Sequence, residues 1–359
     1  MTEASVDLVA DDATLPSAAP PDRRGQRLLS RIGWLLVVVW AAVTVTFVLS
    51  RIVPADPARL AAGMQAGPEQ VAEVRRQLGL DRPLPEQYVE YVTGLARGDF
   101  GDSVQTRRPV IDDLGTYLPA TLELVVYSFI LFAITGVSLG IIWAVWPRGV
   151  HSWLIRVGSV VGAAVPVFWV GLVFQLVFGS RLGWFPIAGN LEYSRFDVPK
   201  HTGAGTLDAL LALDPAAFAN ATWHLALPVM TIVVTQLALT TRLTRASLSE
   251  QLTRPYVRTA RARGVRERRV VLVDALRNAA NPVITMLGLQ FGWLLGSTIL
   301  IEVMFSWPGL GSYAFNAFRT FDYNPIMAIT IVITVAFVLV NELVNVLYPR
   351  LDPRLRDQR

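Results

Sequence analysis

Six apolar stretches that lack any charged residue set the strongest limit on how this chain can fold. They lie at 32–50, 124–146, 157–180, 225–241, 283–301 and 326–341, and the last continues through Glu342 to Tyr348. Each is long enough, or nearly so, to cross a hydrocarbon core of about 30 Å as a helix that rises about 1.5 Å per residue. Charged residues make up 17% of the chain, against about 25% in soluble domains. We therefore predict an all-α integral membrane protein with six transmembrane helices.

The distribution of arginine in the short connections predicts the orientation. Arginines end the tail before the first span, flank the turn after the second, crowd the segment after the fourth and end the chain. Since short cytoplasmic connections carry an excess of positive charge, both termini are expected in the cytoplasm. The predicted order is a cytoplasmic and disordered tail at 1–31, a first span at 32–50, an extracytoplasmic subdomain at 51–117, a membrane core at 118–349 that includes the cytoplasmic segment 242–282, and a cytoplasmic tail at 350–359.

The connections expected outside the membrane differ in pattern. In the first, 68–80 and 85–97 are typical of amphipathic helices, with Val71, Val74 and Leu78 on one face of the first. This predicts a small helical subdomain between spans one and two. The connection at 181–224 is rich in Gly, Ala and Asp and is expected to be less regular, and 302–325 is the third external connection.

The cytoplasmic segment 242–282 is the most basic part of the chain. It carries ten arginines against Glu250, Glu267 and Asp274. Pro255 favours the first position of a helix, after Thr253 or Arg254 as the cap, and Gly264 favours its end because glycine reaches positive φ without strain. We predict a short helix at 255–263, a glycine break, and a longer helix that begins near 267 and runs into the membrane, with the fifth span starting at 281–282.

Side-chain character divides the predicted short helix into two faces. Tyr256, Val257, Ala260 and Ala262 are expected to supply small and apolar contacts, and Arg258, Arg261 and Arg263 to point outward. Charge alone allows two interpretations of the arginines, a topology signal or a surface for a soluble partner. Nucleic-acid binding is disfavoured, because Tyr256 is the only aromatic residue among them.

Several classes of site are excluded by residues that the chain lacks. There is no cysteine, and Lys200 is the only lysine, between Pro199 and His201, so a P-loop with Gly-Lys-Ser/Thr is absent. His151, His201 and His224 are far apart without metal-ligand spacing, and no catalytic set stands out. We expect no metal site, no cofactor on this chain and no enzymatic activity of its own.

Seven ordered motifs carry a resemblance to a known family. They are Leu78-Gly79-Leu80-Asp81-x-Pro83-Leu84-Pro85-x-Gln87-Tyr88, Gly98-Asp99-Phe100-Gly101-x-Ser103, Leu118-Pro119-Ala120-Thr121-Leu122-Glu123-Leu124, His224-Leu225-x-Leu227-Pro228, Ala260-Arg261-Ala262-Arg263-Gly264 with its surroundings, Trp307-Pro308-Gly309-Leu310-Gly311 and Asp352-Pro353-Arg354. Together the chain over roughly 32–356 resembles ABC-importer permeases, in the B-type subunit of the dipeptide and oligopeptide branch. The opening Glu-Ala-Ala of the general loop signature is replaced by Thr259-Ala260-Arg261, a change usual in the peptide branch.

The resemblance implies a type I importer permease fold and a heteromeric transporter in a prokaryotic plasma membrane. Two permease subunits would form the path, two partner subunits would bind ATP and Mg, and an extracytoplasmic binding protein would deliver di- or oligopeptides. The short helix would couple this chain to an ATPase subunit. Its candidate residues are Tyr256, Val257, Arg258, Thr259, Ala260, Arg261, Ala262, Arg263 and Gly264.

Two further groups of candidate residues follow. Polar residues inside spans are functional candidates, so Gln175, Gln236, Gln290 and Glu342 are predicted to line the path or, alternatively, to bond neighbouring helices. Docking of the binding protein is assigned to Asp99, Phe100, Asp102, Trp307, Pro308 and Gly309. For the aromatic turn around Trp307 the alternative is a belt at the membrane interface.

Other functions remain open at this stage. Importers similar to this one also carry nickel or metal chelates, glutathione and oligosaccharides, and spans do not separate these substrates. An ion-coupled secondary transporter would need charged residues deep in the spans, and five of the six stretches have none. A membrane-embedded enzyme would need a catalytic set.

Overall fold

A computed structural model describes residues 24–52, 57–63, 65–77 and 79–351, and each structural statement below concerns these residues. Within them the fold is helical, and the only extended pairing is an isolated bridge between Asp102 and Pro109. Five helical rods are long and apolar enough to cross a membrane. They are α1 (Arg24–Ile52), α5 (Val110–Val145), α9 (Pro215–Leu252), the continuous α11 (Glu267–Arg269), η2 (Val270–Ala275) and α12 (Leu276–Met304), and α14 (Tyr323–Leu351).

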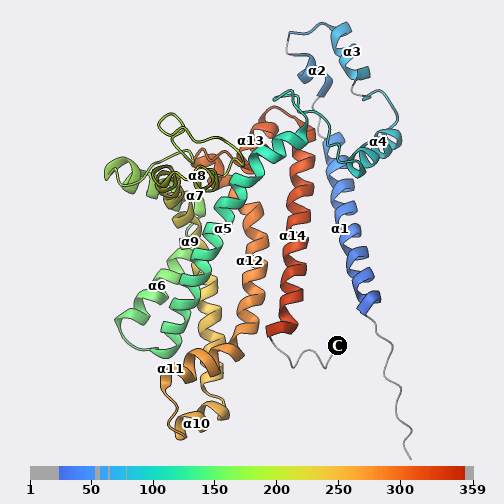
Figure 1. Cartoon of the computed structure of the whole chain (residues 1–359). Helices are drawn as coiled ribbons and strands as arrows, with labels where there is room; N and C mark the ends of the chain where they lie inside the picture. The colour runs from blue at the N-terminus through green and yellow to red at the C-terminus, as the bar shows by residue number, and fades with distance from the viewer. Residues whose placement is uncertain (1–23, 53–56, 64, 78, 352–359) are drawn as a thin grey trace, which may run out of the picture.

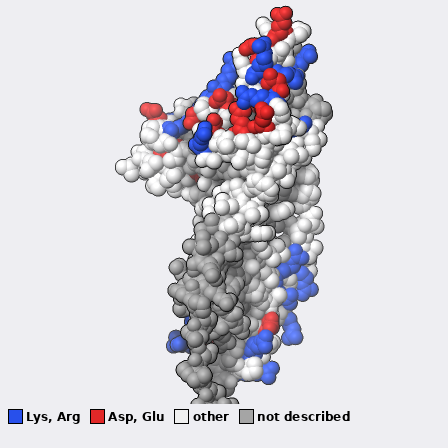
Figure 2. All heavy atoms as spheres, turned by 90° about the vertical axis from the view of Figure 1, so that its right-hand side faces the viewer, with Lys and Arg blue, Asp and Glu red and all other residues white. Residues whose placement is uncertain are grey.

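Shorter helices lie at the two ends of this bundle and along one side. They are α2 (Pro57–Ala62), α3 (Pro68–Gln77), α4 (Leu84–Ala96), α6 (Val150–Ala164), α7 (Val167–Phe174), η1 (Gln175–Arg181), α8 (Gly205–Leu211), α10 (Pro255–Ala262) and α13 (Leu310–Arg319). Figure 1 shows α2, α3, α4 and α13 at one end, which we name the α13 end, and α10 at the opposite α10 end. The face in Figure 2 has charges of both signs at the α13 end, mostly basic side chains toward the α10 end, and a band between them with neither.

The long helices run well beyond the apolar stretches that predicted them. The second stretch begins at 124 but α5 begins at Val110, and the fourth, 225–241, lies inside Pro215–Leu252. Asp214 caps α9, its Oδ1 accepting from the N–H groups of Ala216 and Ala217 at 2.9 and 3.0 Å. The second helix of the basic segment was predicted to run into the fifth span, and this is confirmed, because the helix from Glu267 continues through Pro282 to Met304.

The third predicted span is broken, which corrects the expectation of one helix over 157–180. It consists of α6 followed by α7 and η1, bent by 108° at the break between them. Pro166 lacks an N–H and disfavours helical geometry in the residue before it, and Val165 is accordingly extended at φ −89° and ψ 131°. Six spans are therefore reached only if the bent pair counts as one.

The interior of the bundle is centred on α5 and α9. The α9 rod is the most buried of the five. Two glycines of α5 allow the close contact: a Cβ on Gly136 would lie 2.8 Å from Cβ of Thr240, and one on Gly140 would lie 2.5 Å from Cβ of Thr244. Small residues permit this approach between membrane helices. A cluster of buried apolar side chains from α5, α9, α12 and the turn after it completes the core.

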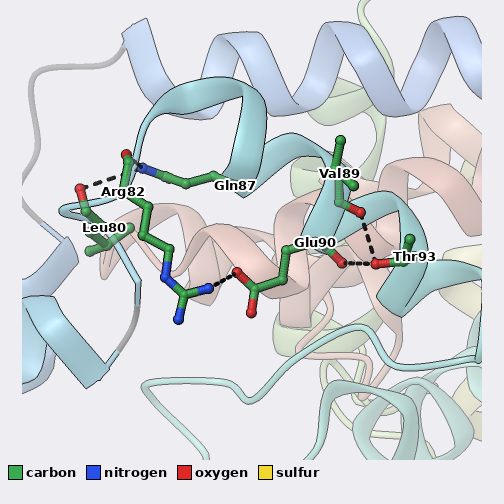
Figure 3. A network of polar contacts seen from close by, with 6 residues as sticks. All are labelled: Leu80, Arg82, Gln87, Val89, Glu90 and Thr93. Carbon is green, nitrogen blue, oxygen red and sulfur yellow. Dashed lines mark hydrogen bonds and ion pairs between the residues drawn. The ribbon is translucent and has the colours of Figure 1, made fainter.

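The predicted helices of the first connection are present as α3 and α4. The expected apolar face of α3 is not buried among the described residues, since the helix has no buried residue. By contrast α4 packs on α1, where the Tyr88 ring lies 5.3 Å from the Phe47 ring and its hydroxyl 2.7 Å from Oγ1 of Thr44. Figure 3 shows Gln87 donating to the carbonyls of Leu80 and Arg82, which holds the turn before α4.

Candidate functional site

The predicted short helix of the basic segment exists as α10, with the expected glycine stop. Arg263 is the C-cap, and Gly264 follows at φ +75°. The N–H of Gly264 donates to the Arg261 carbonyl at 3.0 Å and the N–H of Val265 to the Ala260 carbonyl at 3.2 Å. This paired arrangement requires a left-handed residue directly after the cap, where glycine is least strained.

One side chain anchors α10 to the bundle. Val257 is fully buried and packs in a small core with Leu248 at the end of α9 and with Val270, Val271 and Ala275 of η2. The predicted division of faces was partly wrong. Val257 is buried and Ala260 is half-buried, but Ala262 is exposed and the Tyr256 side chain is 38% exposed.

The arginines of α10 differ in what they contact. Arg261 forms a two-point ion pair with Glu267, Nε to Oε2 at 3.1 Å and Nη2 to Oε1 at 2.6 Å, and this hydrogen bonding raises the pKa of its guanidinium. Arg258 and Arg263 are exposed and form no ion pair within the described part of the chain. Their charges are therefore the ones that α10 presents to its surroundings.

The predicted path-lining residues are distributed along the bundle. Gln290 is buried, accepts from Oγ1 of Thr240 at 2.8 Å and lies 3.4 Å from the Gln236 carbonyl, which joins α12 to α9. Gln175 donates to the carbonyls of Ile187 and Met304 at 2.9 and 3.0 Å. These bonds match the alternative role between helices. Glu342 is half-buried in α14, and substrate contact by any of the four stays a prediction.

At the α13 end, the turn from 305 to 312 is fixed on α5. The indole of Trp307 is fully buried and donates to the Ala120 carbonyl at 2.8 Å. Gly309 is buried, and a Cβ on it would lie 2.3 Å from Oε2 of Glu302. The expectation that Trp307 faces a docking protein does not fit this geometry, because its side chain has no exposed surface. Pro308 is half-buried.

Glu302 holds this turn and was missed by the sequence reasoning. It is fully buried at the end of α12, and its carboxylate accepts from Oγ1 of Thr121 at 2.7 Å and from the N–H groups of Gly311 and Ser312 at 2.6 and 3.2 Å. Thr121 also accepts from the N–H of Leu310 at 2.7 Å. Its position one residue beyond the uncharged stretch 283–301 was the available signal, since an acid there needs partners.

The turn that contains Asp99, Phe100 and Asp102 is fixed beside it. Ser103 donates to Oδ2 of Asp322 at 2.7 Å, and the Asn324 amide donates to the Asp102 carbonyl at 2.9 Å. Asp99 and Asp102 are exposed and Phe100 is half-buried. The structure thus brings the 98–103 and 307–311 motifs to one end of the molecule, where the first presents two exposed carboxylates.

An open pocket of about 380 Å³ lies next to the fixed turn. Its lining includes Tyr117, Ser306, Pro308, Tyr313 and Asn316. The rings of Tyr117 and Tyr313 stack at 4.7 Å. Aromatic faces and neutral polar groups with no charged side chain make this pocket suitable for an uncharged group.

Comparisons with known proteins identify the family of this chain. The family model of the binding-protein-dependent transport system inner membrane component matches residues 136–357, and the model of the N-terminal part of such components matches 26–125. The chain is 42% identical over 324 residues to the probable D,D-dipeptide transport system permease protein DdpB of Escherichia coli, covering 90% of this chain and 95% of that relative.

Two other relatives are similar over comparable lengths. The di/tripeptide transport system permease protein DppB of Pseudomonas aeruginosa is 38% identical, covering 92% of this chain and 98% of the relative. The glutathione transport system permease protein GsiC of Pectobacterium atrosepticum is 37% identical, covering 92% and 97%. The family resemblance predicted from the motifs is confirmed, and the chain belongs to the permease family of the binding-protein-dependent ABC importers.

Proposed function

We propose that this chain is one of two permease subunits of an importer of short peptides in a prokaryotic plasma membrane. Both termini and α10 then lie in the cytoplasm, as the arginine-rich short connections predict. Two partner subunits bind ATP and Mg and hydrolyse ATP, and an extracytoplasmic protein delivers the substrate. The relatives that are named for D,D-dipeptides, di/tripeptides and glutathione support a short peptide as substrate.

The coupling role is supported by how α10 packs on the bundle. Its exposed face carries the unpaired charges of Arg258 and Arg263, while its buried face consists chiefly of Val257 in a core shared with α9 and η2. A displacement of α10 by an ATPase subunit is therefore passed directly to two rods that cross the membrane. Domain motions of this kind move packed elements as rigid bodies.

Charge reversal on α10 tests the coupling role. Arg258→Glu should reduce uptake of a labelled dipeptide to background while the variant accumulates in the membrane in normal amount, because the exposed Arg258 side chain forms no ion pair within the described fold. Arg277→Glu is the matched control, since Arg277 is also exposed in the same basic segment but lies outside α10. Uptake at the wild-type rate in Arg258→Glu, or equal losses in both variants, would contradict the coupling assignment.

Docking of the binding protein is proposed for the exposed carboxylates of the 98–103 turn. Asp99 accepts from the N–H of Gly101 at 2.8 Å and so shapes its own turn, which makes Asp102 the cleaner choice. In reconstituted transporter, Asp102→Arg should weaken the stimulation of ATPase activity by the binding protein, whereas Asp81→Arg, an exposed acid at the same end, should leave it intact. Unchanged stimulation in Asp102→Arg would exclude this surface.

A further inference from the structure

The short helix α8 buries its polar side chains and exposes its apolar ones, the reverse of a helix at a water-facing surface. Its polar side chains point inward: Asp208 is fully buried and accepts from Thr202 and Gly203, and Thr206 is buried against Glu123. Its leucines point outward, with Leu207 43%, Leu210 57% and Leu211 56% exposed. A helix at a water-facing surface carries the opposite distribution.

The turn after α8 places another exposed leucine at a position that usually holds glycine. The N–H of Leu213 donates to the Leu210 carbonyl and the N–H of Asp214 to the Ala209 carbonyl, both at 3.1 Å. This helix end needs a left-handed residue, usually glycine, directly after the cap. Leu213 occupies that position at φ +53°, and its side chain is 85% exposed. The backbone conformation is unfavourable for leucine in any surroundings, whereas the exposure is unfavourable in water.

The depth of α8 along the bundle is fixed by α5. Glu123 accepts from the N–H groups of Gly205 and Thr206 at 3.1 and 2.7 Å, which attaches the first turn of α8 to that residue. Glu123 directly precedes the uncharged stretch 124–146, so it marks the boundary between the polar and apolar parts of α5. The leucines of α8 therefore lie at the level where the apolar part of the span begins.

A second exposed apolar surface lies on α7 and η1. The pair α7 and η1 lies at 108° to α6 and exposes Trp169 and Leu172, each 53%, and Leu176, 50%. Figure 1 shows α7 and α8 standing out together to one side of α5 and α9. The described chain leaves more than half of each side chain of Leu210, Leu211 and Leu213 exposed to the surroundings of the bundle.

We propose that Leu207, Leu210, Leu211 and Leu213, named the leucine edge, are inserted among lipid acyl chains at the membrane boundary of the α13 end. The segment 181–224, which was expected to be a less regular external connection, is then partly a membrane-surface element. Lipid is the occupant because Glu123 places the edge at the level where the apolar part of α5 begins, and the polar groups of α8 are turned away from the edge. Interfacial helices bind membranes in this way through one buried apolar face.

Nitroxide accessibility tests the proposal, and the absence of cysteine from the chain makes single labels unambiguous. The assembled transporter would carry a labelled cysteine in place of Leu210 or Leu213, in vesicles of phosphatidylethanolamine and phosphatidylglycerol. Collision rates would be measured with oxygen, which concentrates in the hydrocarbon, and with a water-soluble nickel chelate. The matched control is Arg195→Cys, an exposed position in the same segment, and Ile134→Cys in α5 is the reference within a span.

The expected result is a ratio of oxygen to nickel collisions at 210 and 213 that is several-fold higher than at 195 but below that at 134, which lies deeper in the span. A ratio equal to that at 195 would show that the leucine edge stands in water and would overturn the proposal. Low rates with both reagents would show that a protein subunit covers the edge, which would overturn it as well. Each labelled variant must retain peptide uptake, so that a disturbed fold is recognised separately.

Discussion

The two ends of the bundle are held together by different kinds of contact. At the α10 end, Val257 packs in an apolar cluster drawn mainly from the neighbouring segments 248–279, together with Ala144 of α5, and the ion pair of Arg261 joins residues six positions apart. At the α13 end, buried polar side chains join distant segments: Thr121 to Glu302 across 181 positions, and Ser103 to Asp322 across 219. The α10 helix can thus detach or unfold locally while the bundle stays folded. The contacts at the α13 end join distant segments, so their loss should destabilise the whole fold.

The largest effect is expected at Glu302. Glu302→Ala removes the acceptor for Thr121 and for two backbone N–H groups, and each buried donor left unpaired costs about 1–3 kcal/mol. The free energy of unfolding should fall by at least about 3 kcal/mol, visible as a lower unfolding temperature in detergent and reduced accumulation in the membrane. Glu302→Gln keeps one acceptor oxygen, so its unfolding temperature should lie between those of the parent chain and of Glu302→Ala. An unchanged unfolding temperature in the alanine variant would show that packing alone closes this end.

A smaller and local effect is expected at Val257. Val257→Ala removes two buried methyl groups, about 2 kcal/mol of local stability. Amide exchange in 255–264 should become faster and uptake should fall, while the unfolding temperature stays near that of the parent chain. A drop in unfolding temperature as large as for Glu302→Ala would remove the distinction between the two ends.

The same distinction explains what the sequence could predict. Pro255 and Gly264 mark α10 by local backbone preferences, so the helix was found to within one residue at its end. The break at Pro166 also has a local cause and is predictable from the proline. A prediction of spans from uncharged stretches alone does not detect it. The partners of Glu302 and Asp322 could not be read, because a single sequence does not say which segments meet. It shows only that acids at the edges of apolar stretches need partners.

Which side chains are buried was equally hard to predict where burial depends on contacts between distant segments. Trp307 stands in a turn, which favours exposure, but its indole finds the Ala120 carbonyl and is buried. The leucines of α8 were assigned to a loop by the composition of 181–224, and only the bonds from Glu123 and Asp208 reveal which face is turned inward. Burial in both cases depends on residues far away in the chain.

The pH dependence of stability should reveal a further contact of the α13 end. Burial raises the pKa of the Asp322 carboxyl, and hydrogen bonds from Ser103 and from the Gln105 N–H act in the opposite direction. The folded state then binds this proton more tightly than the unfolded state. Its contribution to stability is full below the unfolded pKa and is lost as pH rises through the folded pKa.

Replacement of this carboxyl tests the assignment. Asp322→Asn should flatten the decline of unfolding temperature over that pH window, by about 1.4 kcal/mol for each unit of pKa shift. Asp99→Asn, an exposed carboxyl in the adjoining turn, is the control and should keep the slope. An identical pH profile in parent and Asp322→Asn would assign the decline to other groups.

The smallest effects are expected in the exposed part of the α13 end. There an exposed polar contact and a buried polar contact can be compared within one network. Arg82 and Glu90 pair at 2.9 Å in Figure 3, with side chains 53% and 63% exposed, and such pairs contribute less than about 1 kcal/mol. Gln87 lies in the same network but is 8% exposed. Arg82→Ala should leave the unfolding temperature unchanged, whereas Gln87→Ala should lower stability by about 1 kcal/mol, since two carbonyls lose a donor. Equal effects would mean that α4 is held by its apolar contact with α1 and not by buried polar bonds.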